Sequence, residues 1–336
     1  MQVESLHTQR TAGVEMIVAI DSTRPGPALG GCRWRPYADR RSAVTEACAL
    51  AAAMTRKAAL ACLSLGGGKA VVLGDPARRT PDQLRAFGAF VDSLGGRYVT
   101  AADMGTGESE MAVIAEETQH VVGLPAELGG CGEPAPFTAR GVRLAIEAAL
   151  EAIDRPLRGA RVAVQGVGRV GSALVRELVE AGAETVVADP DPRAVNALAG
   201  IEVVPPALLL RTECDVLAPC GPPGVLDGSS VDELRCRVVC GSANNPLEDP
   251  RVAAKLRERG ILYVPDFLSS AGGLIHLAVA LEGGDPETSR QRLDVIPENL
   301  RTILRTSDAE GIGPLEAAEE LALVRLADGG HAKDLG

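Results

Sequence analysis

The sequence predicts an α/β protein with two domains. Short runs rich in β-branched residues alternate with longer segments of helical periodicity, a pattern typical of sheets covered by helices. The length of 336 residues suits two domains with separate cores. A composition of 46% hydrophobic and 24% charged residues is that of an ordinary folded protein, which excludes a disordered chain or a fibre.

The first half of the chain supplies the predicted N-terminal domain, residues 1–136. Thr80 and Pro81 predict a helix start, because Thr is a favoured N-cap residue and Pro fits the first helical turn. A stretch rich in Gly and Pro predicts turns over residues 24–31. The other elements predicted for this domain are strands at Val14–Ile20, 71–73 and 98–101, and an Ala-rich helix over 42–54.

Gly and Pro concentrate again at residues 129–136, as expected at a domain boundary. In the second predicted domain, 137–310, Thr138 is expected to cap a helix that runs to about residue 152. Strands and helices then alternate as far as residue 265. Three helical segments follow, at 271–283, 289–311 and 314–327. The last segment, 311–336, is predicted to pack back on the first domain, because Leu residues line one side of its helix and Glu the other.

Charge and composition exclude several classes of partner. A net charge of −11 leaves no basic surface for nucleic acid or an anionic membrane, and only 2% of residues are aromatic, which leaves few platforms for stacked bases. No uncharged apolar run reaches 18 residues, so no membrane span is expected. The eight cysteines form no CxxC and no secretion signal is present, which predicts a reduced, cytoplasmic protein. The four histidines lack ligand spacing, so no metal is expected.

One stretch of the second domain has the pattern of a dinucleotide site. An apolar strand runs into Gly166-Val167-Gly168-Arg169-Val170-Gly171 and then into a helix. Gly166 allows a tight turn, Gly168 lets the backbone approach a pyrophosphate, and Gly171 permits close packing of the helix on the sheet. The next strand ends in Asp189, eighteen residues after the third glycine, where a ribose 2′-hydroxyl would bind.

This pattern predicts a Rossmann-type domain with NAD as its cofactor. Asp189 would repel the 2′-phosphate of NADP, and the nearby Arg193 is expected on a solvated helix face. The alternative is a glycine-rich turn followed by an incidental aspartate. The complete order of strand, glycines, helix, strand and Asp favours the cofactor site.

Lysine is rare in this chain. Only Lys57, Lys69, Lys255 and Lys333 carry an ammonium group, against thirty arginines. A lysine kept in such a chain can supply an amine that loses its proton, which a guanidinium does not do in proteins. Lys69 follows three glycines, so backbone and ligand can approach it closely. A solvated lysine at the end of a glycine loop is the alternative.

Several ordered motifs run along nearly the whole chain. They are Gly-Pro-Ala-Leu-Gly-Gly at 26–31, Met-Thr-Arg-Lys at 54–57, the glycine-lysine segment at 63–76, Thr-Ala-Ala-Asp-Met-Gly-Thr at 100–106, Thr-Ala-Arg-Gly-Val at 138–142, the nucleotide loop, Cys-Asp-Val-Leu-Ala-Pro-Cys at 214–220, Gly-Ser-Ala-Asn-Asn at 241–245 and Pro-Asp-Phe-Leu-Ser-Ser-Ala-Gly-Gly at 265–273. In these motifs the sequence resembles the glutamate/leucine/phenylalanine/valine dehydrogenases, and within them the shorter NAD-dependent branch that acts on apolar amino acids.

The resemblance implies reversible oxidative deamination of an L-amino acid to the 2-oxo acid, ammonia and NADH. It implies that Lys57 binds the substrate carboxylate, that Lys69 polarises the reacting oxygen and activates water, and that Asp103 exchanges a proton with the substrate nitrogen. It also implies a cleft between the domains and a homo-oligomer assembled through the first domain. Further implied positions are Thr138, Cys220 and Asn244 near the cofactor, and Gly30, Met54, Leu274 and Leu277 in the substrate pocket.

Single residues also have plainer interpretations. Asp103 could begin a turn or cap a helix, and nothing near Cys220 indicates a reactive thiol. His276 lies on an apolar helix and is predicted to be a packed histidine rather than a base. The chain departs from the family at residues 221–224, where Gly-Pro-Pro-Gly removes two backbone donors near the expected cofactor, and at Ser270, where the family usually has Asn.

The implied pocket is apolar, which disfavours glutamate because its second carboxylate would be buried without a partner. Leu274 and Leu277 favour valine or leucine as the substrate, because they narrow the pocket. Two alternatives stay open. One is an aromatic substrate, phenylalanine or tryptophan, and the other is a catalytically silent NAD-binding homologue.

Overall fold

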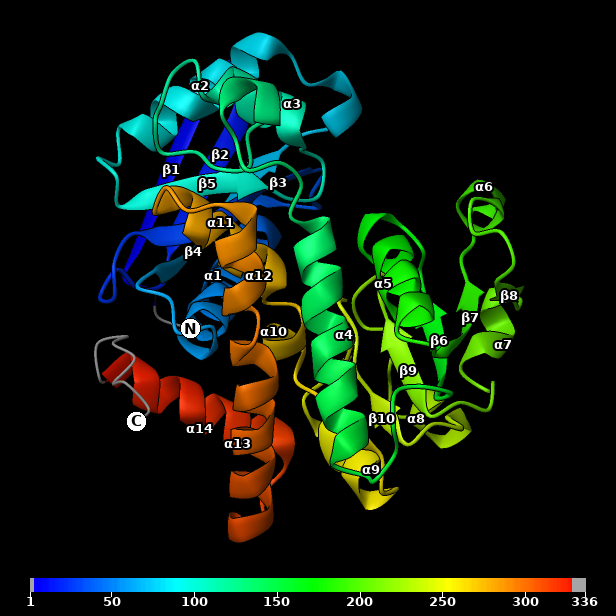
Figure 1. The fold of residues 1–336 in the computed structure, drawn as a ribbon. Coiled ribbons are helices and arrows are strands. Elements are labelled where there is room, and N and C mark those ends of the chain that lie inside the picture. The colour runs from blue at the N-terminus through cyan, green and yellow to red at the C-terminus, as the bar shows by residue number, and fades with distance from the viewer. Residues whose placement is uncertain (1–2, 328–336) are drawn as a thin grey trace. The chain divides into compact units, whose positions relative to one another are not determined.

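The chain forms two compact units, and the computed structural model describes residues 3–327 (Figure 1). Unit 1 holds the chain up to Pro134, Leu274–Ser289 and the residues from Ala322 onward. Unit 2 holds Ala135–Gly273 and Arg290–Leu321. Compared with the predicted domain limits, this division assigns 274–289 to unit 1 and 311–321 to unit 2. The end of the predicted C-terminal segment, 328–336, lies outside the described residues.

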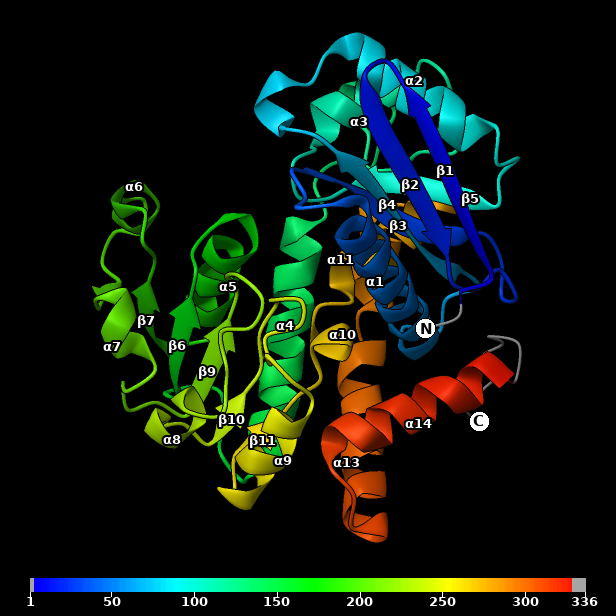
Figure 2. The same ribbon diagram turned by 180° about the vertical axis from the view of Figure 1, so that it is seen from behind.

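Unit 1 is built on a mixed sheet that has, in the described part of the chain, five strands in the order β1-β2-β4-β3-β5 (Figure 2). The pairs β1·β2 and β2·β4 are antiparallel, whereas β3 is parallel to both β4 and β5. Buried Trp34, Phe87 and Tyr98 are among the largest side chains of its core. The elements are β1 (Ser5–Thr11), β2 (Val14–Ile20), β3 (Ala28–Arg35), α1 (Arg40–Leu60), β4 (Gly66–Leu73), η1 (Pro76–Arg78), α2 (Pro81–Asp92), β5 (Tyr98–Ala102), α3 (Glu108–Ile114) and η2 (Ala126–Leu128).

The predicted strand Val14–Ile20 and the predicted start of α2 are confirmed, with the Thr80 side chain accepting from the amide of Gln83. Two other predictions for unit 1 are wrong in extent. Half of the predicted turn at 24–31 belongs to β3, and β4 begins at Gly66 rather than at residue 71. The reason is packing: a Cβ placed on Gly67 would lie 2.1 Å from the backbone nitrogen of Thr55 in α1. These glycines bring a strand and a helix close together instead of forming a loop.

Unit 2 contains a parallel sheet with the strand order β11-β10-β9-β6-β7-β8 among the described residues. The chain enters at the middle strand, extends the sheet to one side and then to the other, which is the Rossmann order. The predicted α/β fold with a Rossmann-type second domain is confirmed. Its elements are α4 (Ala135–Glu151), β6 (Arg161–Gln165), α5 (Arg169–Glu180), β7 (Glu184–Ala188), α6 (Pro192–Asn196), β8 (Glu202–Val203), α7 (Pro206–Leu209), β9 (Val216–Pro219), α8 (Ser230–Glu233), β10 (Val238–Val239), α9 (Arg251–Glu258), β11 (Leu262–Tyr263), α10 (Asp266–Ser269) and α13 (Val295–Glu310).

Three further helices contribute residues to both units: α11 (Gly272–Leu281), α12 (Pro286–Arg292) and α14 (Pro314–Ala327). Near the end of α14, in its unit 1 part, the guanidinium of Arg325 donates to the carbonyl of Leu60 at 2.8 Å. In unit 2, Thr138 lies inside the first turn of α4 and does not cap it, which corrects the prediction. Pro136 explains the earlier start, because proline has no N–H to satisfy and fits the first helical turn.

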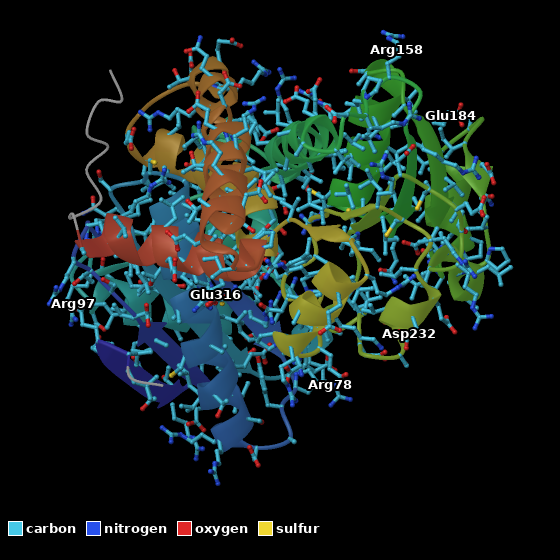
Figure 3. All side chains as sticks on the ribbon, turned by 90° about the horizontal axis from the view of Figure 1, so that it is seen from below. Arg78, Arg97, Arg158, Glu184, Asp232 and Glu316 are labelled. Atoms are coloured by element: carbon cyan, nitrogen blue, oxygen red, sulfur yellow. The ribbon has the colours of Figure 1, made fainter. Side chains whose placement is uncertain are left out.

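Charged side chains of both signs project from the surface of unit 2, among them Arg158, Glu184 and Asp232 (Figure 3). None of the helices within residues 3–327 combines the length and the apolar composition needed to cross a bilayer.

The glycine run of β4 makes a stability prediction. Replacing Gly67 by Ala should lower the free energy of unfolding by about 3 kcal/mol, because the added methyl would overlap a backbone atom of α1. Gly228→Ala is the matched control, since open space surrounds that position, and it should change stability by no more than about 1 kcal/mol. Urea-induced unfolding followed by circular dichroism measures both. Equal stabilities of the two variants would contradict the packing explanation.

Candidate active site

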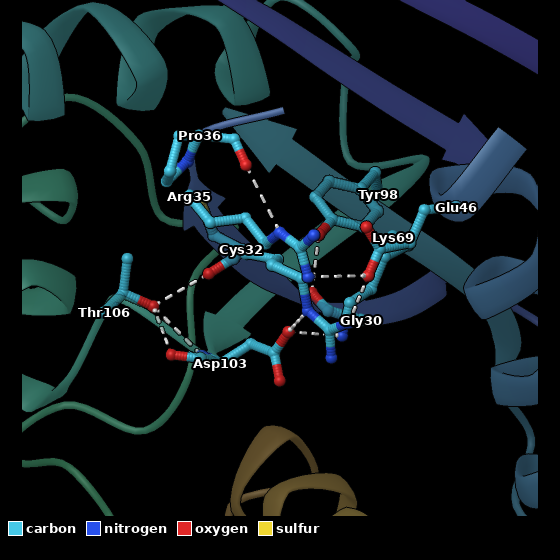
Figure 4. Close-up of polar contacts among 10 residues, drawn as sticks. Gly30, Cys32, Arg35, Pro36, Glu46, Lys69, Tyr98, Asp103 and Thr106 are labelled. Atoms are coloured by element: carbon cyan, nitrogen blue, oxygen red, sulfur yellow. Dashed lines mark hydrogen bonds and ion pairs between the residues drawn. The ribbon is translucent and has the colours of Figure 1, made fainter. Parts of the chain in front are cut away.

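Three neighbouring strands of unit 1 bring the predicted catalytic residues together. Lys69 lies in β4, Asp103 directly follows β5, and β3 runs between these two strands. The Nζ atom of Lys69 lies 2.9 Å from Oδ2 of Asp103 (Figure 4). Two side chains that sequence reasoning connected only through a family resemblance therefore form an ion pair.

Glycines of β3 let the backbones and this pair approach each other. A Cβ on Gly30 would lie 1.7 Å from the carbonyl oxygen of Gly68, and one on Gly31 would lie 2.7 Å from Cβ of Asp103. The hydroxyl of Tyr98 donates to the carbonyl of Gly30 at 2.5 Å. Gly30 is thereby held at the centre of the sheet by contacts that a larger residue would break.

A turn fixes the backbone of Asp103. The hydroxyl of Thr106 accepts from the Asp103 amide at 3.0 Å and donates to the carbonyl of Cys32 in β3 at 2.8 Å. The amide of Thr106 donates to the carbonyl of Asp103, so Asp103 does begin a turn. It does not cap a helix, because α3 begins at Glu108 after Gly107. The turn therefore serves to aim the carboxylate at Lys69.

Arg33 is a second cation at this carboxylate, and sequence reasoning assigned it no role. Its Nε atom lies 2.8 Å from Oδ2 of Asp103, and its Nη1 atom lies 2.5 Å from Oε1 of Glu46 in α1. Burial alone would raise the pKa of the Asp103 carboxyl, but the charges of Lys69 and Arg33 outweigh it and hold that pKa well below its usual range. The Arg33 and Lys69 side chains are only 11% and 7% exposed, which strengthens these interactions.

The other predicted substrate residues also lie in unit 1. Met54 and Lys57 are on α1, whose backbone passes the glycines of β4, and Lys57 is buried. Leu274 and Leu277 are buried on α11, and a Cδ atom of Leu277 would lie 3.5 Å from a Cβ on Gly123. Val121, two residues before Gly123, forms a parallel backbone bridge with Thr100 of β5. Through Gly123, Leu277 therefore lies beside the end of the strand that leads to Asp103.

His276 is packed, as predicted. Its side chain is 1% exposed, with Nδ1 2.9 Å from the hydroxyl of Ser289 and Nε2 3.0 Å from the carbonyl of Cys131. Among residues 3–327, no three His, Cys, Asp or Glu side chains are grouped so that they could hold a metal ion.

The predicted nucleotide residues gather at the carboxyl ends of the parallel strands of unit 2. Gly166 follows β6 with φ of 86°, which suits glycine, and Gly168 is the N-cap of α5. A Cβ on Gly171 would lie 2.0 Å from the carbonyl oxygen of Gly166, so the helix could not start this close to the strand with any other residue. A Cβ on Gly168 would meet no atom within 4 Å, which leaves the backbone open to a ligand.

Asp189 supports the glycine loop from the end of β7. Its Oδ2 atom accepts from the amide of Val167 at 2.8 Å, and its Oδ1 atom accepts from the amide of Asp191 at 2.8 Å. Arg193 is 91% exposed and pairs with Asp191, as expected for a solvated helix face. The carboxylate therefore anchors the glycine loop to the end of β7.

The ends of β9 and β10 complete this edge of the sheet. The amide of Cys220 donates to the carbonyl of Gln165 at 2.7 Å, which places residue 220 against the glycine loop. Burial raises the pKa of the Cys220 thiol, so it is no activated nucleophile. Asn244 is exposed. The backbone carbonyl of the next residue, Asn245, accepts from the amide of Gly224 at 2.9 Å. The Gly-Pro-Pro-Gly loop at 221–224 is thus tied to the Asn pair.

Within unit 2, the first turn of α4 packs against Gly272, the first residue of α11. A Cβ on Gly272 would lie 2.1 Å from the carbonyl oxygen of Phe137 and 3.1 Å from Cα of Thr138. Ser270, which replaces the usual Asn of the family, turns its hydroxyl back to the carbonyl of Asp266 at 2.6 Å.

Comparison with known proteins gives a consistent result. Residues 3–120 match the sequence model of the Glu/Leu/Phe/Val dehydrogenase dimerisation domain, and residues 129–203 and 190–333 match that of the Glutamate/Leucine/Phenylalanine/Valine dehydrogenases. A valine dehydrogenase from Streptomyces virginiae is 42% identical over 95% of this chain and 92% of the relative. A leucine dehydrogenase from Bacillus subtilis is 38% identical over 94% of this chain and 88% of the relative.

Solved structures agree in fold. The crystal structure of L-tryptophan dehydrogenase from Nostoc punctiforme has a TM-score of 0.83 at 35% identity and covers 98% of this chain and 97% of that one. A hetero-hexameric glutamate dehydrogenase from Thermus thermophilus has a TM-score of 0.84 at 27% identity, covering 97% of this chain and 89% of that one. With a family model matched along most of its length and relatives this similar, the chain belongs to the Glu/Leu/Phe/Val dehydrogenase family of amino-acid dehydrogenases, whose members use a nicotinamide dinucleotide.

Proposed function

We propose that this protein catalyses the reversible oxidative deamination of valine or leucine with NAD. In the forward direction, an L-amino acid, NAD⁺ and water yield the 2-oxo acid, an ammonium ion, NADH and one proton. The observation that carries this proposal is the ion pair between buried Lys69 and partly buried Asp103, beside the close-packed glycines of β3 and β4. A silent NAD-binding homologue would have no use for a buried lysine paired in this way.

The residues of the glycine loop fit a dinucleotide. The backbone at Gly168 is open, α5 begins directly after it, and the side-chain oxygen Oε1 of Gln165 is buried without a hydrogen-bond partner among the described residues. Residues 166–171, Asp189, Cys220, Asn244 and Thr138 would hold the cofactor, whose nicotinamide supplies hydride transfer when bound. Asp189 supports NAD over NADP, because a carboxylate repels a ribose 2′-phosphate and the nearby Arg193 already pairs with Asp191.

On the substrate side, each residue has one proposed task. The ammonium of Lys57 would bind the substrate α-carboxylate. Asp103 would accept a proton from the substrate ammonium, because loss of hydride from the α-carbon requires a free amine. Lys69 would remove a proton from the attacking water, return it to the departing nitrogen, and then take up the proton of the remaining hydroxyl as the carbonyl forms, which is the proton released overall. Asp103 would return its proton to the ammonia that leaves as ammonium.

The ion pair links these proton transfers. While Lys69 carries its proton, the pKa of Asp103 is held low and the carboxylate is a weak base. When Lys69 gives up its proton, one of the two positive charges at Asp103 disappears, and the carboxylate becomes a stronger base. The base strength of Asp103 is therefore expected to depend on the charge that faces it.

The substrate side chain is proposed to be branched and aliphatic. Leu274 and Leu277 are buried in unit 1 and carry no polar group that could pair with a side-chain carboxylate. Valine and leucine dehydrogenases are among the similar relatives, but so is an L-tryptophan dehydrogenase from Nostoc punctiforme at 38% identity. An aromatic substrate is therefore the second candidate.

A homo-oligomer in the cytoplasm is also proposed. The family model that matches residues 3–120 is named for dimerisation, and one structural neighbour is a hetero-hexamer. All eight cysteines are free, which suits a reducing compartment.

A substrate panel tests the reaction and the side-chain preference together. With L-valine or L-leucine and NAD at alkaline pH, NADH formation should exceed that with L-phenylalanine or L-tryptophan in kcat/KM by at least about 10-fold, the value of one or two methylenes in a fitted pocket. A preference for an aromatic amino acid would support the second candidate. An absence of turnover with every L-amino acid, in protein that binds NAD, would contradict the proposal.

The glycine loop makes a prediction about the cofactor. Gly168→Ala should keep its stability, because the added methyl meets open space, but should bind NAD at least about 10-fold more weakly, because that methyl lies where the diphosphate must approach. Gly313→Ala, another open position, should leave both properties unchanged. Calorimetric titration with NAD measures the affinity, and unaltered binding by Gly168→Ala would place the diphosphate elsewhere.

Lys69→Arg separates positive charge from proton transfer. The guanidinium can still pair with Asp103 but does not lose its proton, so kcat should fall by at least about 1,000-fold while NAD affinity is retained. Lys255→Arg is the control, because Lys255 lies at the surface paired with Asp232, and it should retain full activity. If Lys69→Arg keeps more than a tenth of kcat, Lys69 acts only through its charge.

A further inference from the structure

Arg33 joins three elements of unit 1 through charge. It extends from β3, donates through Nε to Asp103 at the end of β5 and through Nη1 to Glu46 in α1. Arg33 and Lys69 contact the same oxygen, Oδ2 of Asp103, at 2.8 and 2.9 Å. One edge of the guanidinium thus holds the carboxylate while another is fixed by the helix, an arrangement that a single ammonium cannot reproduce.

The two cations at Asp103 differ in a way that matters for the reaction. In the proposed function Lys69 loses its proton during each cycle. If Arg33 were absent, Asp103 would then be a partly buried carboxylate without a counter-charge. Such a group tends to pick up a proton or to rotate toward water. Arg33 keeps its charge throughout, because a guanidinium does not deprotonate in proteins.

We propose that Arg33, oriented by Glu46, is a positioning residue that keeps Asp103 ionised and aimed at Lys69 while Lys69 is neutral. This inference rests on the proposed function for the identity of the reaction, and on the ion pairs of β3, β5 and α1 for its geometry. Arg33 acts through Asp103 and touches no reacting atom.

The other ionisable groups around Asp103 do not replace Arg33. Burial raises the pKa of the Cys32 thiol and of the Tyr98 hydroxyl, so both stay neutral over the working range of pH. Arg79 is paired with Glu110 in α3. Burial and the neighbouring Glu46 also raise the pKa of Tyr37. Lys69 and Arg33 are therefore the cations that contact the carboxylate among the described residues.

Arg35 offers a matched control. It lies two residues after Arg33, on the same face of β3, and its Nη1 atom is 3.9 Å from Oε1 of Glu46. Its side chain is 44% exposed and lies over the ring of Tyr37 at 4.8 Å, and the structure shows no contact between it and Asp103 among the described residues. Substituting Arg35 removes the same charge from the same strand without freeing the carboxylate.

The pH dependence of kcat/KM with the best substrate of the panel tests the proposal. Arg33→Gln should lower kcat/KM about 100-fold and move the acid limb to higher pH by at least about 1 unit, because losing a positive charge makes the Asp103 carboxylate easier to protonate. Arg33→Lys should return the acid limb to its wild-type position but recover only part of kcat. Arg35→Gln should change kcat/KM by no more than about threefold and should leave the acid limb at its wild-type position.

Glu46→Gln adds a variant with the opposite charge change. It should lower kcat severalfold because Arg33 loses its anchor, while the acid limb stays in place or moves to lower pH because a negative charge is removed. A merely structural role of Arg33 and Glu46 would not shift the limb in opposite directions. This variant also keeps the proposal testable if Arg33→Gln fails to fold.

A measurement without turnover separates this proposal from the proposed function. In the full-length protein with ¹³C-labelled aspartate, the Asp103 carboxyl resonance is assigned by its loss in Asp103→Asn. Relative to the wild-type protein, its titration midpoint should rise by at least about 1 pH unit in Arg33→Gln. In Glu46→Gln the midpoint should be unchanged or lower. A rise in Arg33→Gln without turnover of any amino acid by the wild-type enzyme would overturn the proposed function only. An unchanged midpoint and an unchanged acid limb in folded Arg33→Gln would overturn the role of Arg33.

Discussion

The proposed chemistry of this protein depends on keeping a partly buried carboxylate, Asp103, charged next to the ammonium of Lys69. Asp103 is placed where burial favours its neutral form, and two cations on neighbouring strands reverse that preference. The arrangement needs β3 between β4 and β5, because Arg33 lies in β3, Lys69 lies in β4 and Asp103 directly follows β5. It also needs the turn that Thr106 closes, since that turn fixes the backbone from which the carboxylate extends.

Glycine provides the space for this cluster and for the nucleotide loop in the same physical way. At Gly30, Gly31 and Gly67 the atoms of a neighbouring segment occupy the place of a side chain, so the strands, the helix and the Asp103 side chain approach closely. Gly171 does the same for α5 in unit 2, whereas Gly168 leaves its space open toward a ligand. Each unit thus uses close backbone packing to present charged or dipolar groups, an ammonium in unit 1 and helix amides in unit 2.

Sequence reasoning was most successful where local pattern and structure agree. The strand at Val14–Ile20, the helix start at Thr80 and the order of strand, glycines, helix and Asp189 all follow from local rules. Prediction failed where glycines pack against distant segments. Residues 28–31 of β3 were predicted as part of a turn and β4 was predicted to begin only at residue 71, because the atoms that fill the space at these glycines are distant in sequence. Arg33 was missed for the same reason. Its partners Asp103 and Glu46 lie 70 and 13 residues away, and only the alternation within residues 28–35 could have indicated that a strand carries it. Lysine scarcity and the preceding glycines drew attention to Lys69, which is buried in the structure, but the ion pair that supports its proposed role is visible only in the fold.

The most direct test of the central claim is a double-mutant cycle on kcat/KM with Lys69→Ala, Asp103→Asn and the combined variant. If the two residues work as one proton-transfer unit, the combined variant should be about as slow as the slower single variant, since each substitution already removes the function of the pair. If the two losses multiply, Lys69 and Asp103 act independently, and the ion pair is not the basis of catalysis.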